Sequence, residues 1–357
     1  MKAVILAAGQ GTRLRPVTLT MPKPLVPVAN KALIVYAIEV LKGAGLKEIG
    51  IVVNNLDSPI TNHLGDGSSL GVKITYIVQE EQKGLAHAIG LTQPFVGDQP
   101  FCVFLGDNIF QDKMQDLLRS FPTMDAEAAI VLGEVSDPTR FGIAEVTGDA
   151  ITRVVEKPKD PPSNLAICGV YLFRSSIFDA ISHIKPSWRN ELEITDAIQE
   201  LIGASRKVYA YKLQGWWIDA GKPNAIINAN HLVLGDMPYI PPPETELING
   251  SSNVSHRVIL GENTQVIDSV IRGPVIIGDN VTIKNSYIGP YTSIGNNVVV
   301  ENSEIEASII MKDCTLLNLP GRIDSSLLAD NTKVVAASSE LPAVQRLILA
   351  ENSYVQL

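Results

Sequence analysis

The sequence predicts an α/β domain with a mainly parallel sheet, followed by a three-sided parallel β-helix. From residue 1 to about residue 234, short apolar runs alternate with helical patterns, which is typical of α/β folds. From residue 248 on, aliphatic residues recur every 17 residues, and three inward aliphatics per turn describe a coil that stacks as a solenoid. The proline-rich stretch 238–243 lies between the two patterns and cannot continue a helix.

The first domain begins with a continuous apolar run from Ala3 to Ala8, which indicates a strand covered on both faces. A helical pattern follows over Ile34–Leu41. Further strands are predicted at 49–53, 74–78 and 101–105. Ligands of parallel sheets bind beyond the carboxyl ends of the strands. We therefore expect the loops after Ala8, Val78 and Leu105 to converge on one crevice.

The loop after the first strand, Gly9-Gln10-Gly11, has the composition of a phosphate cradle. Its glycines carry no Cβ to obstruct a ligand, and its N–H groups can face an anion. The hydroxyl of Thr12, the guanidinium of Arg13 and the ammonium of Lys23 suit phosphate oxygens. A tight turn explains the two glycines alone equally well. A dinucleotide fingerprint does not fit because Leu14 replaces its third glycine, and the sequence has no GxxxxGK[ST] segment.

Two further loops carry polar residues that suit a nucleotide. Gln79 follows the strand at 74–78, and its amide can both donate and accept along the edge of a pyrimidine. Asp107 follows the strand at 101–105, and Asp219 is a second carboxylate shortly before a glycine, so that together they could hold one Mg²⁺. Taken alone, a solvated loop and an ordinary Asp-Asn turn are the simpler explanations of the first two segments.

The composition indicates a soluble globular protein of two domains, since 45% of its 357 residues are hydrophobic and 19% are charged. The net charge of −9 argues against nucleic acid or an anionic membrane as partner, because such binding needs a basic face. Cys102, Cys168 and Cys314 lie far apart and suit free thiols in a reducing cytoplasm. The first apolar run is too short for a signal peptide, and no stretch reaches transmembrane length.

Three aliphatic columns define the predicted coil. The first comprises Leu260, Ile277, Ile294, Met311 and Leu328. The second stands six positions later and comprises Val266, Ile283, Val300, Leu317 and Val334. The third comprises Val254, Ile271, Ile288 and Ile305 and breaks at Arg322. We therefore predict a first domain at 1–234, a proline-rich linker at 235–247, the coil at 248–335 and a C-terminal capping segment at 336–357, with a helix and a closing strand as open alternatives for 340–351.

The segments LAAGQGTRLRP and PKPLVPV resemble the signature of the sugar nucleotidylyltransferases, with a departure at Ala32, where the family usually has proline. The segment GLAHA at 84–88 resembles the glucose-1-phosphate thymidylyltransferases rather than the guanylyltransferases. The segment WIDAG resembles the family's second metal-ligand motif, with Ala220 in place of threonine. The 17-residue coils resemble left-handed hexapeptide coils. The resemblance implies a Rossmann-like mixed-sheet nucleotidyltransferase domain followed by a left-handed parallel β-helix.

The resemblance also implies a role for each site residue. Arg13 and Lys23 correspond to the catalytic cations, and Asp107 and Asp219 to the Mg²⁺ ligands. The nucleotide-binding residues are Leu6, Ala8, Gly9, Gly11, Thr12, Gln79 and Gly84. The sugar-phosphate-binding residues are Gly142, Glu156, Lys157, Gly169, Tyr171 and Arg189. Without the family, Glu156-Lys157 is an exposed charge pair at the end of a strand, whereas Glu193 and Asp196 begin a helix.

The activity that the resemblance implies is Mg²⁺-dependent transfer of a nucleotidyl group from dTTP to glucose 1-phosphate, giving dTDP-glucose and pyrophosphate. Two alternatives stay open: an enzyme that uses UTP, and a regulator that binds nucleotide sugars without turnover. The intact cations and carboxylates favour an enzyme over a regulator. From residue 250 on, His256 is the one histidine that could serve as a base, so we expect the coil to assemble a homo-oligomer rather than transfer acetyl groups.

Overall fold

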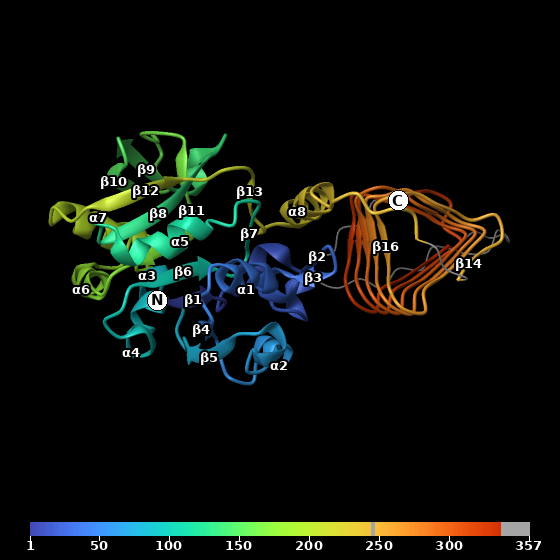
Figure 1. Ribbon diagram of the computed structural model, residues 1–357, viewed down its shortest axis with the longest axis horizontal. Coiled ribbons are helices and arrows are strands. Elements are labelled where there is room, and N and C mark those ends of the chain that lie inside the picture. Colours follow the sequence, from blue (N-terminus) through green and yellow to red (C-terminus); the bar gives the residue numbers. More distant parts are fainter. Residues whose placement is uncertain (244–246, 337–357) are drawn as a thin grey trace. The chain divides into compact units, whose positions relative to one another are not determined.

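The computed structural model describes residues 1–243 and 247–336, and the contacts within the chain divide it into two units. The first unit comprises 1–10, 22–25 and 33–219, and the second comprises 11–21, 26–32 and the chain from residue 220 on. Figure 1 labels helices and strands of both units. Most of the predicted capping segment, 337–357, and residues 244–246 of the predicted linker lie outside the described residues.

A nine-stranded sheet with the order β5-β4-β1-β6-β11-β8-β12-β10-β9 forms the first unit. Its strands are β1 (Lys2–Leu6), β4 (Glu48–Val53), β5 (Lys73–Val78), β6 (Phe101–Leu105), β8 (Ala128–Glu134), β9 (Gly142–Thr147), β10 (Ala150–Glu156), β11 (Leu165–Phe173) and β12 (Val208–Lys212). Strands β1, β4, β5 and β6 are parallel, whereas β11 runs antiparallel to β6 and β8. The predicted mixed sheet is therefore confirmed, and so are the strands predicted at 49–53, 74–78 and 101–105.

Short helices connect these strands. They are α1 (Leu33–Gly43), α2 (Pro59–Leu64), α3 (Leu85–Gly90), α4 (Gln93–Val96), α5 (Gln115–Ser120), α6 (Ser176–His183) and α7 (Ile194–Gly203). Helix α7 packs against β10, and α6 packs against α7. Asp196 lies in the first turn of α7, as predicted, where a negative charge favours the helix dipole. Within residues 1–243 and 247–336, no helix has the length and apolar composition needed to cross a membrane.

The second unit is built around three parallel sheets (orange to red in Figure 1). The first sheet contains β14 (Ile248–Asn249), β17 (Gln265–Ile267), β20 (Thr282–Lys284), β23 (Val299–Glu301), β26 (Thr315–Leu317) and β29 (Lys333–Val335). The second contains β15 (Asn253–Val254), β18 (Val270–Ile271), β21 (Tyr287–Ile288), β24 (Glu304–Glu306) and β27 (Ile323–Asp324). The third contains β16 (Val258–Leu260), β19 (Val275–Ile277), β22 (Thr292–Ile294), β25 (Ile309–Ile310) and β28 (Leu327–Leu328). Strands far apart in sequence thus pair in register, as in a left-handed β-helix.

The fourth coil is one residue shorter than the predicted repeat of 17 residues. Val300 pairs with Leu316 rather than with Leu317, and Ile294 pairs with Ile310 rather than with Met311. The corner after Ile305 is one residue shorter than the corresponding corner of the preceding coil, so the alignment predicted for Leu317 and Met311 was wrong by one position. Because side chains alternate between the two faces of a strand, this shift turns Leu316 and Ile310 to the interior.

The fifth coil restores the stacking by lengthening. The segment Asn318–Gly321 adds residues before β27, and Ile305 consequently pairs with Ile323. The predicted break of the third column at Arg322 is therefore this longer corner, and Ile323 continues the column. Arg322 instead lies on the outside, where its guanidinium donates to the carboxylates of Glu304 and Glu306.

Two other elements of the second unit pack on this coil. The hairpin of β2 (Pro27–Val28) and β3 (Lys31–Ala32) packs on α8 (Pro223–Gly235), and α8 packs on β22. The units therefore group α8 with the coils, while the sequence-predicted boundaries at 234 and 248 stay predictions.

Candidate active site

A short two-stranded ribbon brings the two predicted metal ligands together. Strand β7 (Asn108–Phe110) pairs antiparallel with β13 (Trp217–Asp219), and Asn108 lies opposite Asp219. Asp107 directly precedes β7, so both carboxylates lie at the same end of the ribbon. Lys23, whose side chain is 8% exposed, makes an ion pair with Asp107 Oδ2 and lies 3.5 Å from Asp219 Oδ1.

Two neighbouring side chains orient the Asp107 carboxylate. The buried amide of Asn108 donates from Nδ2 to Asp107 Oδ1 at 2.8 Å. Trp217 Nε1 in turn donates to Asn108 Oδ1 at 2.6 Å, which fixes the orientation of the amide. Neither residue was predicted from the sequence, although Asn108 adjoins Asp107 and Trp217 lies two positions before Asp219.

The carboxylate pair fits a magnesium ion that is shared with a nucleotide. Mg²⁺ prefers oxygen ligands and is usually held by one or two carboxylates together with substrate phosphates. Among residues 1–243 and 247–336, no group of three or more His, Cys, Asp or Glu side chains could hold a metal ion without such help. Asp107 and Asp219 therefore suit a Mg²⁺ site that substrate phosphates complete, and not a site made of protein ligands alone.

Gln79, at the end of β5, is buried and has one side of its amide occupied. Its Nε2 lies 3.1 Å from Nδ1 of His87 and 3.5 Å from the carbonyl oxygen of Gly84. A carbonyl oxygen can only accept, so it faces the amide nitrogen, and His87 Nδ1 is then the acceptor of the second bond. This arrangement leaves the Oε1 atom of Gln79 to accept from a ligand.

Packing inside the protein requires glycine at position 84. Its φ is 105°, and a Cβ at this position would lie 2.5 Å from the carbonyl oxygen of Leu192. Backbone bonds join the same two loops, from Ala86 N–H to Leu192 O and from Leu192 N–H to Lys83 O. The loop that carries Gln79 is thus fastened to the segment that precedes α7.

A second charged cluster brings together the predicted sugar-phosphate residues Glu156, Lys157 and Arg189. Glu156 Oε1 lies 3.4 Å from Lys157 Nζ and 3.6 Å from Arg189 Nη1. Burial raises the pKa of the Glu156 carboxyl, and the positive charge of Lys157 opposes this shift. Glu156 is therefore partly buried within an ion-pair cluster and is not the exposed pair that its sequence alone indicated.

Glu193 also belongs to this cluster, as a partner of Arg189. It is the residue before α7, as predicted, but its side chain is only 4% exposed. Its Oε1 accepts from Arg189 Nη1 at 3.2 Å and from Ser187 Oγ at 2.9 Å. Arg189 Nη2 also lies 3.0 Å from Glu191 Oε2. Glu193 is thus a buried partner of Arg189, a role that its position at a helix start did not reveal.

The remaining residues predicted to bind the sugar phosphate lie on strands β9 and β11. A Cβ on Gly142 would lie 2.8 Å from Thr195 Cγ2 and 3.2 Å from Glu156 Oε2. Gly169 has a φ of 81°, and a Cβ there would collide with Leu105. Tyr171 is buried, and its pKa is raised by burial and by nearby negative charges that include Glu156 and Asp107.

The start of the predicted phosphate loop also lies in the first unit. β1 ends at Leu6, and the buried Ala8 that follows accepts a 2.7 Å hydrogen bond from Gln82 Nε2 at its carbonyl. A Cβ on Gly9 would meet nothing within 4 Å, so packing inside the protein does not require glycine at this position. Gln82 was missed by the sequence analysis and ties this loop to the loop of Gln79.

The rest of the phosphate loop belongs to the second unit. Gly11 has a φ of 62°, and its carbonyl accepts from Thr18 Oγ1 at 2.8 Å. Thr12 and Arg13 follow it in a short 3₁₀ helix, Thr12–Leu14. Lys23 and Arg13 therefore fall in different units.

Residues 2–235 match the family model described as nucleotidyl transferase. The chain belongs to this family. It is 45% identical, over the full length of both chains, to a protein of Haloferax volcanii named low-salt glycan biosynthesis nucleotidyltransferase Agl11. It is 40% identical to a glucose-1-phosphate thymidylyltransferase of Streptomyces griseus, covering 100% of this chain and 99% of the relative.

Shorter relatives match the N-terminal part of this nucleotidyl transferase. A second Haloferax volcanii protein, UTP–glucose-1-phosphate uridylyltransferase AglF, is 41% identical over 62% of this chain and 92% of the relative. A crystal structure of a Bacillus anthracis protein in complex with a sucrose has a TM-score of 0.61 and 38% identity, and the match covers 65% of this chain and 94% of that one. The chain is therefore an enzyme of the nucleotidyl transferase family that carries a C-terminal coil in addition to the matched region.

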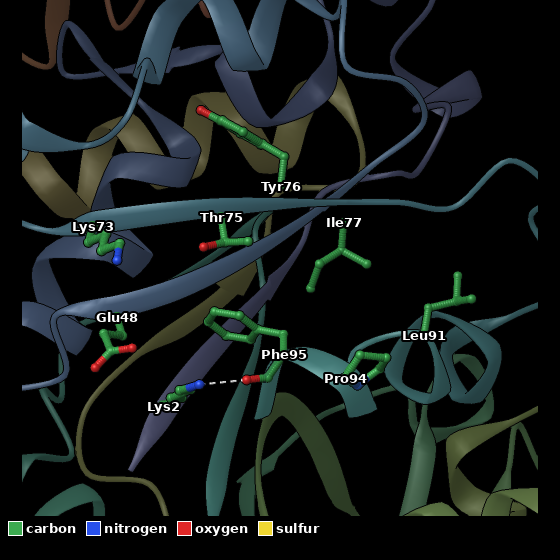
Figure 2. Close-up of a pocket in the computed structure, with 9 residues that line it drawn as sticks. All are labelled: Lys2, Glu48, Lys73, Thr75, Tyr76, Ile77, Leu91, Pro94 and Phe95. Carbon is green, nitrogen blue, oxygen red and sulfur yellow. Dashed lines mark hydrogen bonds between the residues drawn. The ribbon is translucent and has the colours of Figure 1, made fainter. Parts of the chain in front are cut away.

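This nucleotidyl transferase also has a hollow of about 570 Å³ away from the site loops (Figure 2). Lys2, Glu48 and Lys73 line it, and each is the first residue of a parallel strand. Site loops follow the last residues of two of these strands, β1 and β5. Inside the hollow, Lys2 Nζ already donates to the carbonyl oxygen of Phe95 at 2.6 Å. The hollow therefore begins at the first residues of these strands and extends along β5 to Ile77.

Proposed function

We propose that the chain transfers a thymidylyl group from dTTP to glucose 1-phosphate, giving dTDP-glucose and pyrophosphate. The observation that carries the proposal is the position of Lys23 beside both Asp107 and Asp219. One cation and two carboxylates at one point suit a triphosphate that arrives with a metal ion. The thymidylyltransferase from Streptomyces griseus, at 40% identity over the full length, supports the choice of substrates.

The proposed chemistry needs positioning and charge neutralisation but no general base. A phosphate oxygen of glucose 1-phosphate, already anionic, forms a bond to the α-phosphorus of dTTP. The bond from that phosphorus to the bridging oxygen breaks, and pyrophosphate leaves with the electron pair. When Mg²⁺ is bound, it supplies neutralisation of the phosphate charge. Lys23 and Arg13 are proposed to hold the charge that develops on the pyrophosphate.

Asp107 and Asp219 are the proposed metal ligands, and the loop residues Leu6, Ala8, Gly9, Gly11 and Thr12 the proposed contacts of the nucleotide. On the sugar side, Lys157 and Arg189 are proposed to bind the phosphate, with Glu156 binding sugar hydroxyls. Gly142, Gly169 and Tyr171 are proposed to complete this side of the site. Their support is that the Glu156–Lys157–Arg189 cluster is assembled by ion pairs within one unit.

The base is proposed to be a pyrimidine that presents an N–H to Gln79. The Oε1 atom of Gln79 can accept, because its Nε2 is directed at His87 and Gly84. Thymine and uracil carry a hydrogen on N3, whereas the N3 atom of cytosine is an acceptor. The arrangement thus supports dTTP or UTP over dCTP.

UTP is the second candidate nucleotide, because AglF is 41% identical over the matched region. Thymine and uracil differ by one methyl group, which is worth about 1–3 kcal/mol in an apolar pocket. We also propose that the enzyme is cytoplasmic, that its coil supports a homo-oligomer, and that the coil has no acetyltransferase activity.

A pyrophosphate-release assay tests the proposal. It pairs dTTP, UTP, dCTP, GTP and ATP with glucose 1-phosphate, glucosamine 1-phosphate and mannose 1-phosphate, in Mg²⁺ and in EDTA. We expect the highest kcat/KM for dTTP with glucose 1-phosphate and no rate in EDTA. GTP as the best nucleotide, or binding of dTTP without release from any sugar phosphate, would contradict the proposal.

A further inference from the structure

The side chain of Gln82 connects the loops that follow three neighbouring strands of the first unit. These strands are β5, β4 and β1, in that order in the sheet. Gln82 lies in the loop after β5, and its Nε2 donates to the carbonyl of Ala8, after β1, at 2.7 Å. The same Nε2 donates to Oδ1 of Asn54, directly after β4, at 3.1 Å. A carbonyl oxygen can only accept, so it faces the amide nitrogen, and both hydrogens of Nε2 are engaged.

This bridge holds a part of the loop that the sheet and the core do not hold. The loop begins on the sheet, because the backbone N–H groups of Ala7 and Gln79 donate to carbonyls of the last two residues of β4, each at 2.9 Å. Residues 80–83 that follow are all exposed, so apolar packing does not fix them. The two bonds of Gln82 therefore set how far the middle of this loop lies from the start of the phosphate loop.

This separation matters for a nucleotide that contacts both loops. On one side lies Gln79, whose Oε1 atom is the proposed acceptor for the base. On the other side lie Ala8 and Gly9, which are proposed contacts of the nucleotide, and a Cβ on Gly9 would meet nothing within 4 Å. The nucleoside has to reach from one loop to the other. A purine is longer than a pyrimidine from its glycosidic nitrogen to its hydrogen-bonding edge, so it needs a larger separation.

We propose that Gln82, supported by Asn54, is a positioning residue that fixes this separation and thereby favours pyrimidine over purine triphosphates. The proposal rests on the proposed function, in which Gln79 binds the base. His87 and Gly84 hold the amide of Gln79 independently of Gln82. Thymine and uracil have the same length, so the bridge does not distinguish dTTP from UTP.

The test compares three variants of the bridge with a control in the full chain. Gln82→Ala removes the bridge without adding a charge, and Asn54→Ala removes its support alone. Gln82→Glu keeps the shape of the side chain, but a carboxylate cannot donate to the carbonyl of Ala8. The matched control is Gln93→Glu, because Gln93 is an exposed glutamine of the same unit, at the start of α4, and gains the same charge. Gln82 and Asn54 are exposed, so we expect all variants to fold with unchanged thermal midpoints.

Dissociation constants for dTTP, UTP and ATP, measured by calorimetry in Mg²⁺, decide the proposal. In Gln82→Ala the Kd for dTTP should rise about fivefold, the factor expected for one hydrogen bond. The Kd for ATP should not rise, so the ratio of the ATP constant to the dTTP constant should fall about fivefold. The ratio of the UTP constant to the dTTP constant should stay unchanged. Gln82→Glu should lower the ATP-to-dTTP ratio in the same way, and Gln93→Glu should leave it unchanged.

Two further measurements separate positioning from a general loss of structure. Asn54→Ala should raise the Kd for dTTP about twofold by itself, and should add nothing in the Gln82→Ala background, because both changes act through one bridge. The KM for glucose 1-phosphate should stay unchanged in Gln82→Ala. The backbone bonds that tie Lys83 and Ala86 to Leu192 do not involve the bridge.

An unchanged Kd for dTTP in Gln82→Ala, or an equal rise for all three nucleotides, would overturn the proposal. If the unaltered chain binds dTTP but releases no pyrophosphate with any sugar phosphate, the proposed function fails, and the dissociation constants still decide whether Gln82 selects the base. A chain that binds none of the three nucleotides would overturn both proposals.

Discussion

The candidate active site and the coil differ in the contacts that stabilise them. Contacts in the site join residues at irregular and long sequence separations, whereas contacts in the coil join residues one turn apart. In the site, Lys23 contacts Asp107, which lies 84 positions away, and each charged residue has different partners. In the coil, like residues meet like residues at intervals of 16 to 18 positions, as in the Asn280–Asn297 and Asn302–Asn318 bonds. A change in the site should therefore affect chemistry more than stability, and a change in the coil should do the reverse.

The largest effect is expected at Asp107. Asp107→Asn keeps the volume and one acceptor but removes the charge next to Lys23, so we expect kcat to fall at least 1,000-fold, in the range of about 4 kcal/mol of lost transition-state stabilisation. The thermal midpoint should stay within about 2 °C. Pyrophosphate release and calorimetry measure the two quantities. The control is Asp98→Asn, an exposed carboxylate of the same unit. A rate near that of the control would remove the metal assignment.

The coil should give the opposite result. Ile283 is fully buried, and Ile283→Ala leaves a cavity that should cost about 2–5 kcal/mol of unfolding free energy. With both proteins assayed at one temperature, 10 °C below the unfolding midpoint of the variant, the kcat of Ile283→Ala should equal that of the unaltered chain. Lys284→Ala, the next residue on the same strand and exposed, should change stability by less than about 0.5 kcal/mol. Loss of kcat in the folded Ile283→Ala protein would show that the two regions are not separable in this way.

A smaller effect is expected at His87, which acts on the base through Gln79. His87→Ala frees the amide of Gln79 to rotate, so its oxygen no longer faces the base in a fixed way. The ratio of kcat/KM for dTTP to that for dCTP should fall about fivefold to tenfold, the range expected for one hydrogen bond. His63→Ala is the control, since His63 is an exposed residue of α2. An unchanged ratio would mean that His87 does not orient Gln79.

The smallest effect is a pH dependence at Glu156. Burial raises the pKa of this carboxyl above its ordinary value of 4.5, so the folded state binds its proton more tightly than the unfolded state does. Glu156 then costs stability increasingly as the pH rises from 4.5 through the raised pKa. Urea unfolding should therefore show that Glu156→Gln gains stability relative to the unaltered chain over this window. A relative loss as the pH rises would mean that Lys157 and Arg189 outweigh burial.

The elements that could be predicted from the sequence are those whose cause is local or periodic. The apolar runs at 49–53, 74–78 and 101–105 became strands because a continuous apolar segment of that length is buried as a parallel strand. The coil followed from its repeat, because each turn must bury the same three columns. Even there, the register failed after Ile305, since a corner that is one residue shorter carries no signal in the aliphatic columns.

The contacts between side chains could not be predicted in this way, because they depend on the tertiary fold. No pattern in the sequence pairs Asn230 with Ala29, or Glu193 with Arg189, rather than with solvent. From the sequence, an isolated charged residue or amide is predicted to lie on the surface. Burial of such a group is stable only when residues from other segments form hydrogen bonds or ion pairs with it. Those partners are set by the topology, which places β7 beside β13 and the hairpin beside α8. Local sequence patterns therefore determine the helices and strands, whereas the hydrogen bonds and ion pairs of buried polar groups determine the geometry of the site.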